Sequence, residues 1–274
     1  MKTTVINKIE SRRFVYDHAI MEGARPEDFP SHIHESYEIL FFLRGSISYM
    51  VEGKSYKLRR GDLVFTRPSV FHNVHPTGGG VYERYNVVFD EKMVPEGVRK
   101  RIPKDVDVFN FRDLPRMYDI FAKIDEYSKS FLGEELVRIT RSLIEEVFYN
   151  LATAEGGISG HTSANPLVMK AVEYIHENLT TVSGIEEICD ALYITKSHLH
   201  HLFSTNIGVS PKQYITSKRL LLAQGHIRRG EKPTAVAGLC GFDDYATFFR
   251  NYKRHFGYSP SEENDSKSKK EINA

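Results

Sequence analysis

Three histidines and one glutamate in the first third of the chain have the types and spacing of a binding site. His32, His34 and Glu38 all have even numbers, so in an extended segment, whose side chains alternate, they point to one face. His72 can join them from a neighbouring strand. Imidazole and carboxylate groups hydrogen bond polar molecules and also bind metal ions. The four residues are therefore a candidate ligand site, with purely structural histidines as the alternative.

A second set of polar side chains lies in a repeat near the other end of the chain. A shift of 49 positions aligns Gly208-Val-Ser-Pro211 with Gly257-Tyr-Ser-Pro260. Each copy has a short helical segment, a tight break and a second helical segment, which is typical of a helix-turn-helix unit. The predicted helices are 185–192 and 196–206 in the first copy, and 235–239 and 245–255 in the second.

The second helix of each copy has an apolar face and a polar face. Helical spacing predicts that Leu199, Leu202 and Phe203 are buried in the first copy, and that Phe248 and Tyr252 are buried in the second. Thr195 and Asp243 are the predicted N-caps. The other side chains are short hydrogen-bonding or cationic groups suited to a major groove: Lys196, Ser197, His200, His201, Ser204, Thr247, Arg250, Asn251, Lys253 and Arg254. The alternative is a pair of helical hairpins with solvated faces.

The second half strongly resembles the AraC/XylS family of bacterial transcription regulators. The resemblance is most specific in GFDDYATFFRNYKRHFGYSP and in ITKSHLHHLFSTNIGVSPKQYITSKRLLLAQ. It implies an all-α domain in which two helix-turn-helix units, joined by a long helix, bind successive major grooves of double-stranded DNA. The implied base-reading residues are Ser197, His200, His201, Tyr245, Thr247 and Arg250; Thr195 and Lys253 would lie nearer phosphates, and Lys196 and Asn251 belong to the same surface.

The first half resembles the cupin pattern in two blocks, His32 to Gly45 and GDLVFTRPSVFH. In metal-binding cupins the three histidines and the glutamate are ligands of a divalent ion such as Fe, Mn, Ni or Zn. In AraC-type regulators, however, a cupin-like barrel usually binds a small organic effector, so no cofactor is expected and a metal is the alternative. The effector, with a sugar or other polyhydroxylated molecule as a candidate, would contact His32, His34, Tyr37, Glu38, Arg44 and His72.

The elements that must position these residues change type along the chain. EILFFLRG, SISYMVEGKSYKLRRGD, LVFTRP and ERYNVVFD are predicted strands of a barrel, and helical periodicity begins near Leu114. The prediction is therefore a multidomain α and β protein. Its segments are a cupin-like effector-sensing barrel (1–112), a helical dimerisation segment (113–154), a linker (155–165), the double helix-turn-helix domain (166–260) and a disordered tail (261–274).

An apolar stripe on the helix after the barrel has two interpretations. Leu136, Ile139, Leu143, Val147 and Leu151 recur at steps of three and four residues. The stripe either pairs with its copy in a homodimer, which the resemblance favours, or covers the barrel. If the stripe forms a dimer interface, charged residues in place of Leu143 and Val147 would yield monomers.

Composition excludes several classes of protein and leaves partners open. The 274 residues are 41% hydrophobic and 27% charged, which excludes collagen and largely disordered chains. The net charge is +1 overall, with 11 Lys and Arg against 8 Asp and Glu between Pro166 and Pro260, so DNA binding must depend on local charge. The two cysteines, Cys189 and Cys240, lie in apolar stretches and suit buried thiols of a cytoplasmic protein.

The sequence therefore predicts an effector-controlled regulator rather than an enzyme. No signal peptide or membrane span is recognisable, so no membrane partner is expected. The resemblance implies an activator, with RNA polymerase as a further partner. The alternative is a metal-dependent cupin enzyme, a dioxygenase or isomerase, that uses His32, His34, Glu38 and His72 as ligands. That alternative leaves the second helix-turn-helix copy without a role.

Overall fold

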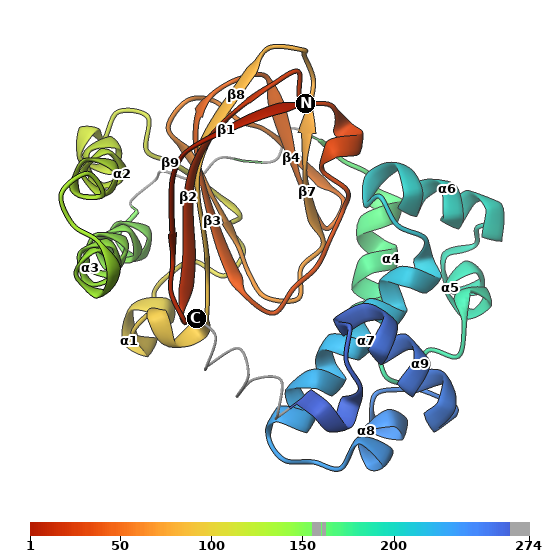
Figure 1. The fold of residues 1–274 in the computed structure, drawn as a ribbon. Helices are drawn as coiled ribbons and strands as arrows, with labels where there is room; N and C mark the ends of the chain where they lie inside the picture. Colours follow the sequence, from red (N-terminus) through yellow and green to blue (C-terminus); the bar gives the residue numbers. More distant parts are fainter. Residues whose placement is uncertain (155–159, 161–162, 264–274) are drawn as a thin grey trace. The chain divides into compact units, whose positions relative to one another are not determined.

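The computed structural model describes residues 1–154, 160 and 163–263, and the chain divides into two compact units, Met1–Ser163 and Ala164–Ala274 (Figure 1). Most of the segment predicted as a linker, and residues 264–274 of the predicted tail, lie outside the described residues. Among the described residues, no helix combines the length and the apolar character that a membrane span requires.

The first unit is built on two antiparallel sheets. The larger sheet has the strand order β1-β2-β8-β3-β6-β9, and the smaller has the order β10-β5-β4-β7. The strands are β1 (Lys2–Glu10), β2 (Phe14–Glu22), β3 (Tyr37–Arg44), β4 (Ile47–Val51), β5 (Lys54–Lys57), β6 (Asp62–Thr66), β7 (His72–Pro76), β8 (Val81–Phe89), β9 (Val108–Asn110) and β10 (Ser163–Ala164). The shorter helices are η1 (Pro26–Asp28), η2 (Glu91–Met93) and α1 (Glu96–Arg99). The cupin-like barrel is thus formed by two facing sheets that do not close into one.

Strand β3 of the larger sheet is buried on both faces, and its successive residues face two different layers. On one face, Leu40 and Phe42 of β3 belong to the core between the two sheets. On the other face, Phe41 stacks on Phe121 of α2 (Pro115–Tyr127), with ring centroids 5.0 Å apart. Figure 1 shows α2 and α3 (Gly133–Ala152) together on this outer face. The near-continuous apolar run of β3 follows from this double burial.

The stripe from Leu136 to Leu151 covers the sheet of its own chain. Ile144, Val147 and Leu151 are fully buried in the core that includes β3, β6 and β8. Leu136, Val147 and Leu151 of the stripe are therefore not available to a second copy, whereas Ile139 and Leu143 are half-buried, and a homodimer through the 113–154 segment stays a prediction. The sequence showed that the helix has one buried face, but periodicity does not say what buries it.

The second unit contains the predicted pairs of helices. They are α4 (Pro166–Glu177), α5 (Ile185–Leu192), α6 (Lys196–Asn206), α7 (Pro211–Arg228), α8 (Pro233–Leu239), α9 (Tyr245–Phe256) and η3 (Pro260–Glu262). The bounds predicted for α5 and α6 are confirmed. Helix α8 begins two residues before the predicted start, with Pro233 in its first turn, and α9 ends one residue later than predicted.

The end of the domain differs from the prediction of a tail that begins at Ser261. Ser259 caps η3, and Glu263 is only 1% exposed. Glu263 accepts hydrogen bonds from Gln224 and from Tyr252, and it pairs with Arg228 at 2.7 Å. Residues 261–263 are therefore part of the folded domain. Cys189 and Cys240 are buried thiols, as predicted.

Candidate functional site

Helix α6 exposes one face and buries the other as its sequence predicts. Leu199, Leu202 and Phe203 are at most 4% exposed. Thr195 is the N-cap, and its hydroxyl accepts a hydrogen bond from the backbone of His198 at 3.2 Å. The candidate contact residues all lie on the exposed side: Thr195, Lys196, Ser197, His200 and His201. Lys196 pairs there with Glu186 of α5.

Helix α9 has the same division, with one correction at its start. The N-cap is Asp244 rather than Asp243, because Asp244 Oδ1 accepts a 2.7 Å hydrogen bond from the backbone of Thr247. This bond holds the pKa of Asp244 below its usual value. Phe248 and Tyr252 are fully buried. Tyr245, Arg250 and Lys253 are exposed, and Thr247 and Asn251 are half-buried.

The guanidinium of Arg250 is already oriented along its helix. Arg250 Nη2 donates to Thr247 Oγ1 at 3.0 Å, and Asn251 Nδ2 donates to the Thr247 carbonyl at 2.9 Å. Because this hydrogen bond already restricts the planar guanidinium, the side chain loses less conformational entropy when it binds a base edge. One exposed residue was missed by sequence reasoning: Tyr193, 95% exposed, lies in the turn before α6 with a left-handed φ of 53°. Its position between two predicted helices was the available signal.

The long helix α7 ties the two helix-turn-helix units together through Arg219. Its guanidinium donates to three backbone carbonyls: Leu179 O at 2.7 Å, Val182 O at 2.6 Å and Gly241 O at 2.7 Å. The first two belong to the segment before α5, and the third belongs to the turn between α8 and α9. One half-buried side chain thus fixes the turn of the second helix-turn-helix unit against the segment that leads into the first.

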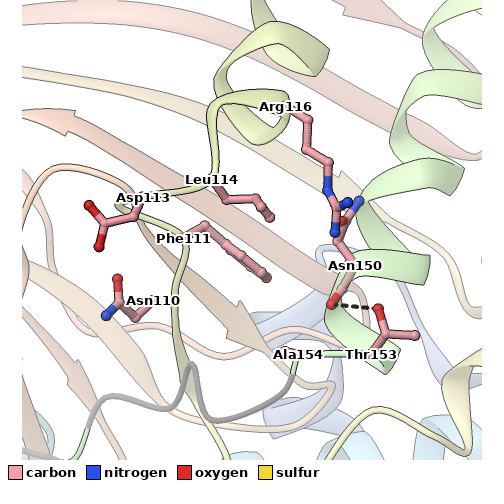
Figure 2. Close-up of a pocket in the computed structure, with 8 residues that line it drawn as sticks. All are labelled: Asn110, Phe111, Asp113, Leu114, Arg116, Asn150, Thr153 and Ala154. Atoms are coloured by element: carbon pink, nitrogen blue, oxygen red, sulfur yellow. Dashed lines mark hydrogen bonds between the residues drawn. The ribbon is translucent and has the colours of Figure 1, made fainter.

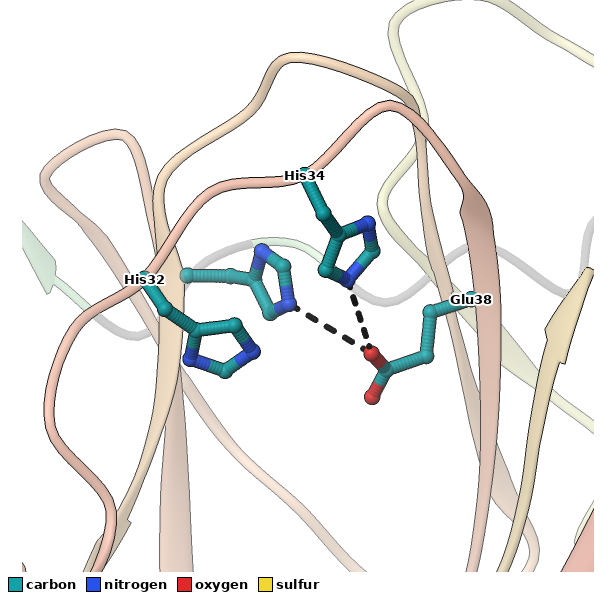
Figure 3. Close-up of side chains that lie close together, drawn as sticks. His32, His34 and Glu38 are labelled. Atoms are coloured by element: carbon teal, nitrogen blue, oxygen red, sulfur yellow. Dashed lines mark hydrogen bonds and ion pairs between the residues drawn. The ribbon is translucent and has the colours of Figure 1, made fainter. Parts of the chain in front are cut away.

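The first unit brings the four predicted residues of the barrel together. One nitrogen from each of His32, His34 and His72 and one oxygen of Glu38 all lie within 4.8 Å of one another (Figure 3). Backbone hydrogen bonds in both directions between His32 and His72 place these two residues side by side. Glu38 lies at the start of β3, and its Oε2 is 3.3 Å from His34 Nε2 and 3.5 Å from His72 Nε2.

Burial and charge act in opposite directions on Glu38. Burial alone would raise the pKa of its carboxyl group, but the imidazoles of His34 and His72 beside it hold that pKa well below its usual range. Burial lowers the pKa of His32, and the neighbouring His72 lowers it further. The site therefore holds a carboxylate beside a His32 ring whose neutral form is favoured.

Two of the predicted effector residues do not lie with this cluster. Tyr37 precedes Glu38 on β3 and so faces the opposite layer, where it stacks on Phe65 and Phe89 at 5.6 and 5.4 Å between ring centroids. Arg44 lies at the far end of the same strand, is exposed, and pairs with Glu83 at 3.0 Å. Strand alternation separates Tyr37 from Glu38, and strand length separates Arg44 from it.

Strand β8 adds three polar side chains that sequence reasoning missed. The Asn86 amide, in the orientation that satisfies both of its polar atoms, donates to Glu38 Oε1 at 3.1 Å and to the Ile39 carbonyl at 2.9 Å. Tyr82 belongs to the core between the sheets, and its buried hydroxyl has no hydrogen-bond partner among the described residues. Arg84 pairs with Asp17. The signal was a polar side chain at each of the alternating positions 82, 84 and 86, on the strand beside β3.

A separate pocket of about 290 Å³ lies where α2 begins and α3 ends (Figure 2). Phe111, Leu114, Arg116 and Asn150 are among the residues that line it. None of the predicted site residues lines this pocket.

Comparisons with known proteins match both halves of the chain. The family described as "AraC-like ligand binding domain" matches residues 19–152, and the one described as "Helix-turn-helix domain" matches residues 188–265. The "HTH-type transcriptional activator RhaS" of Yersinia pestis (strain Pestoides F) is 25% identical over 256 residues, which cover 88% of this chain and 91% of that protein. The "Lactose operon transcription activator" of Staphylococcus xylosus is 25% identical over 228 residues, 80% of this chain and 79% of that protein.

Among solved structures, ToxT from Vibrio cholerae O395 is 13% identical, with a TM-score of 0.39 and coverage of 92% of this chain and 97% of that one. The two family matches lie on the two units that the structure separates, the sheets with their covering helices and the paired helix-turn-helix units. The chain belongs to the AraC family of transcription regulators, with an N-terminal ligand-binding domain and a C-terminal helix-turn-helix domain.

Proposed function

We propose that α6 and α9 enter successive major grooves of double-stranded DNA and read its sequence. The observation that carries this proposal is the shared design of the two helices, each capped at its start, buried on one side and polar on the other. Arg219 supports this proposal because its hydrogen bonds fix one helix-turn-helix unit to the other. The proposed contacts are Thr195, Lys196, Ser197, His200, His201, Tyr245, Thr247, Arg250, Asn251 and Lys253.

Arg250→Ala is expected to weaken binding to the preferred duplex by about 1–3 kcal/mol, because an arginine that donates to a guanine edge contributes about this much discrimination. The preferred duplex is first selected from a randomised pool with the full-length protein. Affinity is then measured by fluorescence anisotropy on the selected duplex and on a random duplex.

Lys253→Ala is the matched control. Loss of a phosphate contact should weaken binding to both duplexes alike, and it should lower the slope of log affinity against log salt concentration by about one. Equal losses on the two duplexes for Arg250→Ala would show that Arg250 contacts phosphate instead of a base. Absence of any enrichment from the pool would contradict DNA reading altogether.

We propose a polyhydroxylated effector, such as a sugar, for the interior of the barrel. The support is the polar lining of an otherwise apolar core, with Glu38, Asn86 and the unpartnered hydroxyl of Tyr82. The name of the Staphylococcus xylosus relative refers to a lactose operon. Calorimetric titration of the full-length protein with lactose, its component sugars and other common mono- and disaccharides should give heat from at least one of them; a panel without binding would contradict the sugar.

We propose that the effector-bound protein activates transcription in the cytoplasm through contact with RNA polymerase. The names of the two relatives support activation. The effector must then bind one arrangement of the protein more tightly than another. In vitro transcription from a promoter beside the selected duplex should rise when protein and effector are both added; a fall would indicate a repressor.

We propose a homodimer that uses the outer face of α3 in the 113–154 segment, since its inner face is occupied. Tyr149 is 54% exposed on that outer face. Tyr149→Glu should therefore yield monomers in sedimentation velocity runs if the wild type is dimeric. Arg138→Glu, also on the exposed side but at the other end of α3, is the comparison. A dimer that persists in both variants would place the interface elsewhere.

The metal-dependent enzyme is the weaker candidate. It would use only the barrel, whereas the regulator gives a role to both units. It would leave the exposed polar faces of α6 and α9 without a role.

A further inference from the structure

Helix α5 ends in a Schellman motif, the pair of backbone hydrogen bonds that turns the chain just past the end of a helix. The N–H of Tyr193 donates to Asp190 O at 3.3 Å, and the N–H of Ile194 donates to Cys189 O at 3.0 Å. The motif puts Tyr193 in the left-handed region, with φ 53° and ψ 44°. Glycine usually takes this place, because a residue with a Cβ is strained there.

The second helix-turn-helix unit has the same motif with a glycine in that place. At the end of α8, the N–H of Gly241 donates to Gly238 O and the N–H of Phe242 donates to Ala237 O, both at 3.0 Å. Gly241 has φ +81°. The chain thus has two equivalent turns, one before α6 and one before α9. The first turn holds Tyr193 where the second holds the residue that fits without strain.

Contacts of the Tyr193 side chain do not offset this strain. The side chain belongs to a residue that is 95% exposed, more than any other large hydrophobic residue in the described part of the chain. It makes no hydrogen bond, ion pair or ring contact with the residues that the structure describes. Glu52, also left-handed with φ 47°, differs because its carboxylate accepts a 2.8 Å hydrogen bond from the N–H of Phe71. Strain that no contact offsets points to a function for the residue.

The turn continues the surface of α6 that the proposed function places on DNA. Tyr193 lies two residues before Thr195, the exposed N-cap of α6. Lys196, in the first turn of the helix, is paired with Glu186, so its positive charge is partly neutralised. The phenolic hydroxyl of a tyrosine is an uncharged donor, and it is one of the groups by which proteins contact the phosphates of DNA.

We infer that the hydroxyl of Tyr193 donates a hydrogen bond to a backbone phosphate at the edge of the major groove that α6 enters. The inference rests on the proposed function, since α6 must lie in that groove. A phosphate contact carries no sequence information of its own, but it fixes the register and the orientation of the protein on the duplex. Tyr193 is therefore a positioning residue for α6.

Tyr193→Phe tests the hydroxyl alone, because it keeps both the ring and the strained backbone. In fluorescence anisotropy with the full-length protein, its affinity should fall about tenfold or more on the selected duplex and on the random duplex alike. The hydroxyl is uncharged, so the slope of log affinity against log salt concentration should keep its wild-type value, unlike that of Lys253→Ala. Tyr127→Phe, which changes an exposed tyrosine of the other unit, is the matched control and should bind both duplexes like the wild type.

Tyr193→Gly separates binding from folding. It restores the residue that the motif favours, so the unfolding temperature of the full-length protein should rise by a few degrees in scanning calorimetry. The relief of strain should exceed the effect of the added freedom of glycine in the unfolded chain. Affinity for both duplexes should nevertheless fall at least as far as in Tyr193→Phe. A tyrosine that only stabilises the fold would give the opposite result for stability, with the unfolding temperature and the affinity falling together.

Wild-type affinity of Tyr193→Phe for both duplexes would overturn the inference. Normal duplex binding by both Tyr193 variants with reduced transcription in vitro would also overturn it, and would place the tyrosine against RNA polymerase. These outcomes leave sequence reading by α6 and α9 intact if the pool is enriched. Without enrichment, the proposal of sequence reading is contradicted, while affinity for the random duplex still tests the phosphate contact, which does not depend on sequence.

Discussion

Gly241→Ala is expected to destabilise the C-terminal domain by roughly 2 to 5 kcal/mol. Gly241 has φ +81°, a left-handed conformation that costs other residues about 1–2 kcal/mol. A Cβ at this position would also lie 2.5 Å from the Thr180 carbonyl oxygen and 2.8 Å from Arg219 Cζ. Relieving such contacts in a packed region costs a further 1–3 kcal/mol or so. The added Cβ would press against Arg219, which holds the two helix-turn-helix units together, so DNA affinity should fall as well.

Gly230→Ala is the matched control for this prediction. Gly230 lies in the same domain with φ +94°, and nothing lies within 4 Å of an added Cβ. Its substitution should therefore cost only the conformational part, about 1–2 kcal/mol. Urea unfolding of both variants and the wild type measures the difference. An equal loss of unfolding free energy in the two variants would mean that the residues around Arg219 rearrange without a free-energy cost. The close approach at Gly241 would then have no effect on stability.

The helix-turn-helix half could be predicted from sequence because its information is local. The repeat and the spacing of Leu199, Phe203 and Phe248 determine which face of each helix is buried. Capping depends on one side chain and the next turn, so Thr195 was predicted correctly. The error of one residue at Asp244 arose because two aspartates stand side by side and only the geometry selects between them.

The ligand-binding half was predicted less completely because its site depends on strand pairing. The spacing of His32, His34 and Glu38 within one segment is visible in the sequence. Asn86 reaches Glu38 only because β8 pairs with β3 across a long connection. Alternation along β3 turns Tyr37 away from the site. Strands β1 and β2 were not predicted at all, since the charged residues between their apolar ones obscure the pattern.

Residues 261–263 raise the same point for the end of the domain. SEENDSKSKKEINA is so polar that composition predicts disorder from Ser261 onward. Composition cannot show that one carboxylate of this stretch meets a buried tyrosine hydroxyl. Tyr252 is fully buried, and its hydroxyl needs an acceptor that the apolar core around it does not supply.

A chain that ends at Glu262 is therefore expected to be less stable than a chain that ends at Glu263 by roughly 3 kcal/mol. Loss of the carboxylate leaves the Tyr252 hydroxyl, the Gln224 amide and the Arg228 guanidinium without this acceptor. Removing one partner of a buried charged hydrogen bond costs about this much. Urea unfolding of chains that end at Glu262 and at Glu263 measures the difference. Equal stability of the two chains would contradict the anchoring role.

The pH dependence of stability gives an independent check through Glu263→Gln, which keeps the shape of the side chain and removes its charge. Burial tends to raise the pKa of Glu263, but hydrogen bonds from Tyr252, Gln224 and Arg228 lower it overall. A carboxyl group whose pKa is lower in the folded than in the unfolded state stabilises the fold above its unfolded pKa, near 4.3, and loses that contribution as pH falls through the folded value. The wild type should therefore exceed Glu263→Gln in stability at pH 7, and the excess should shrink as the pH falls below about 4. An excess that does not change with pH would show that the ionised carboxylate is not what anchors the end of the domain.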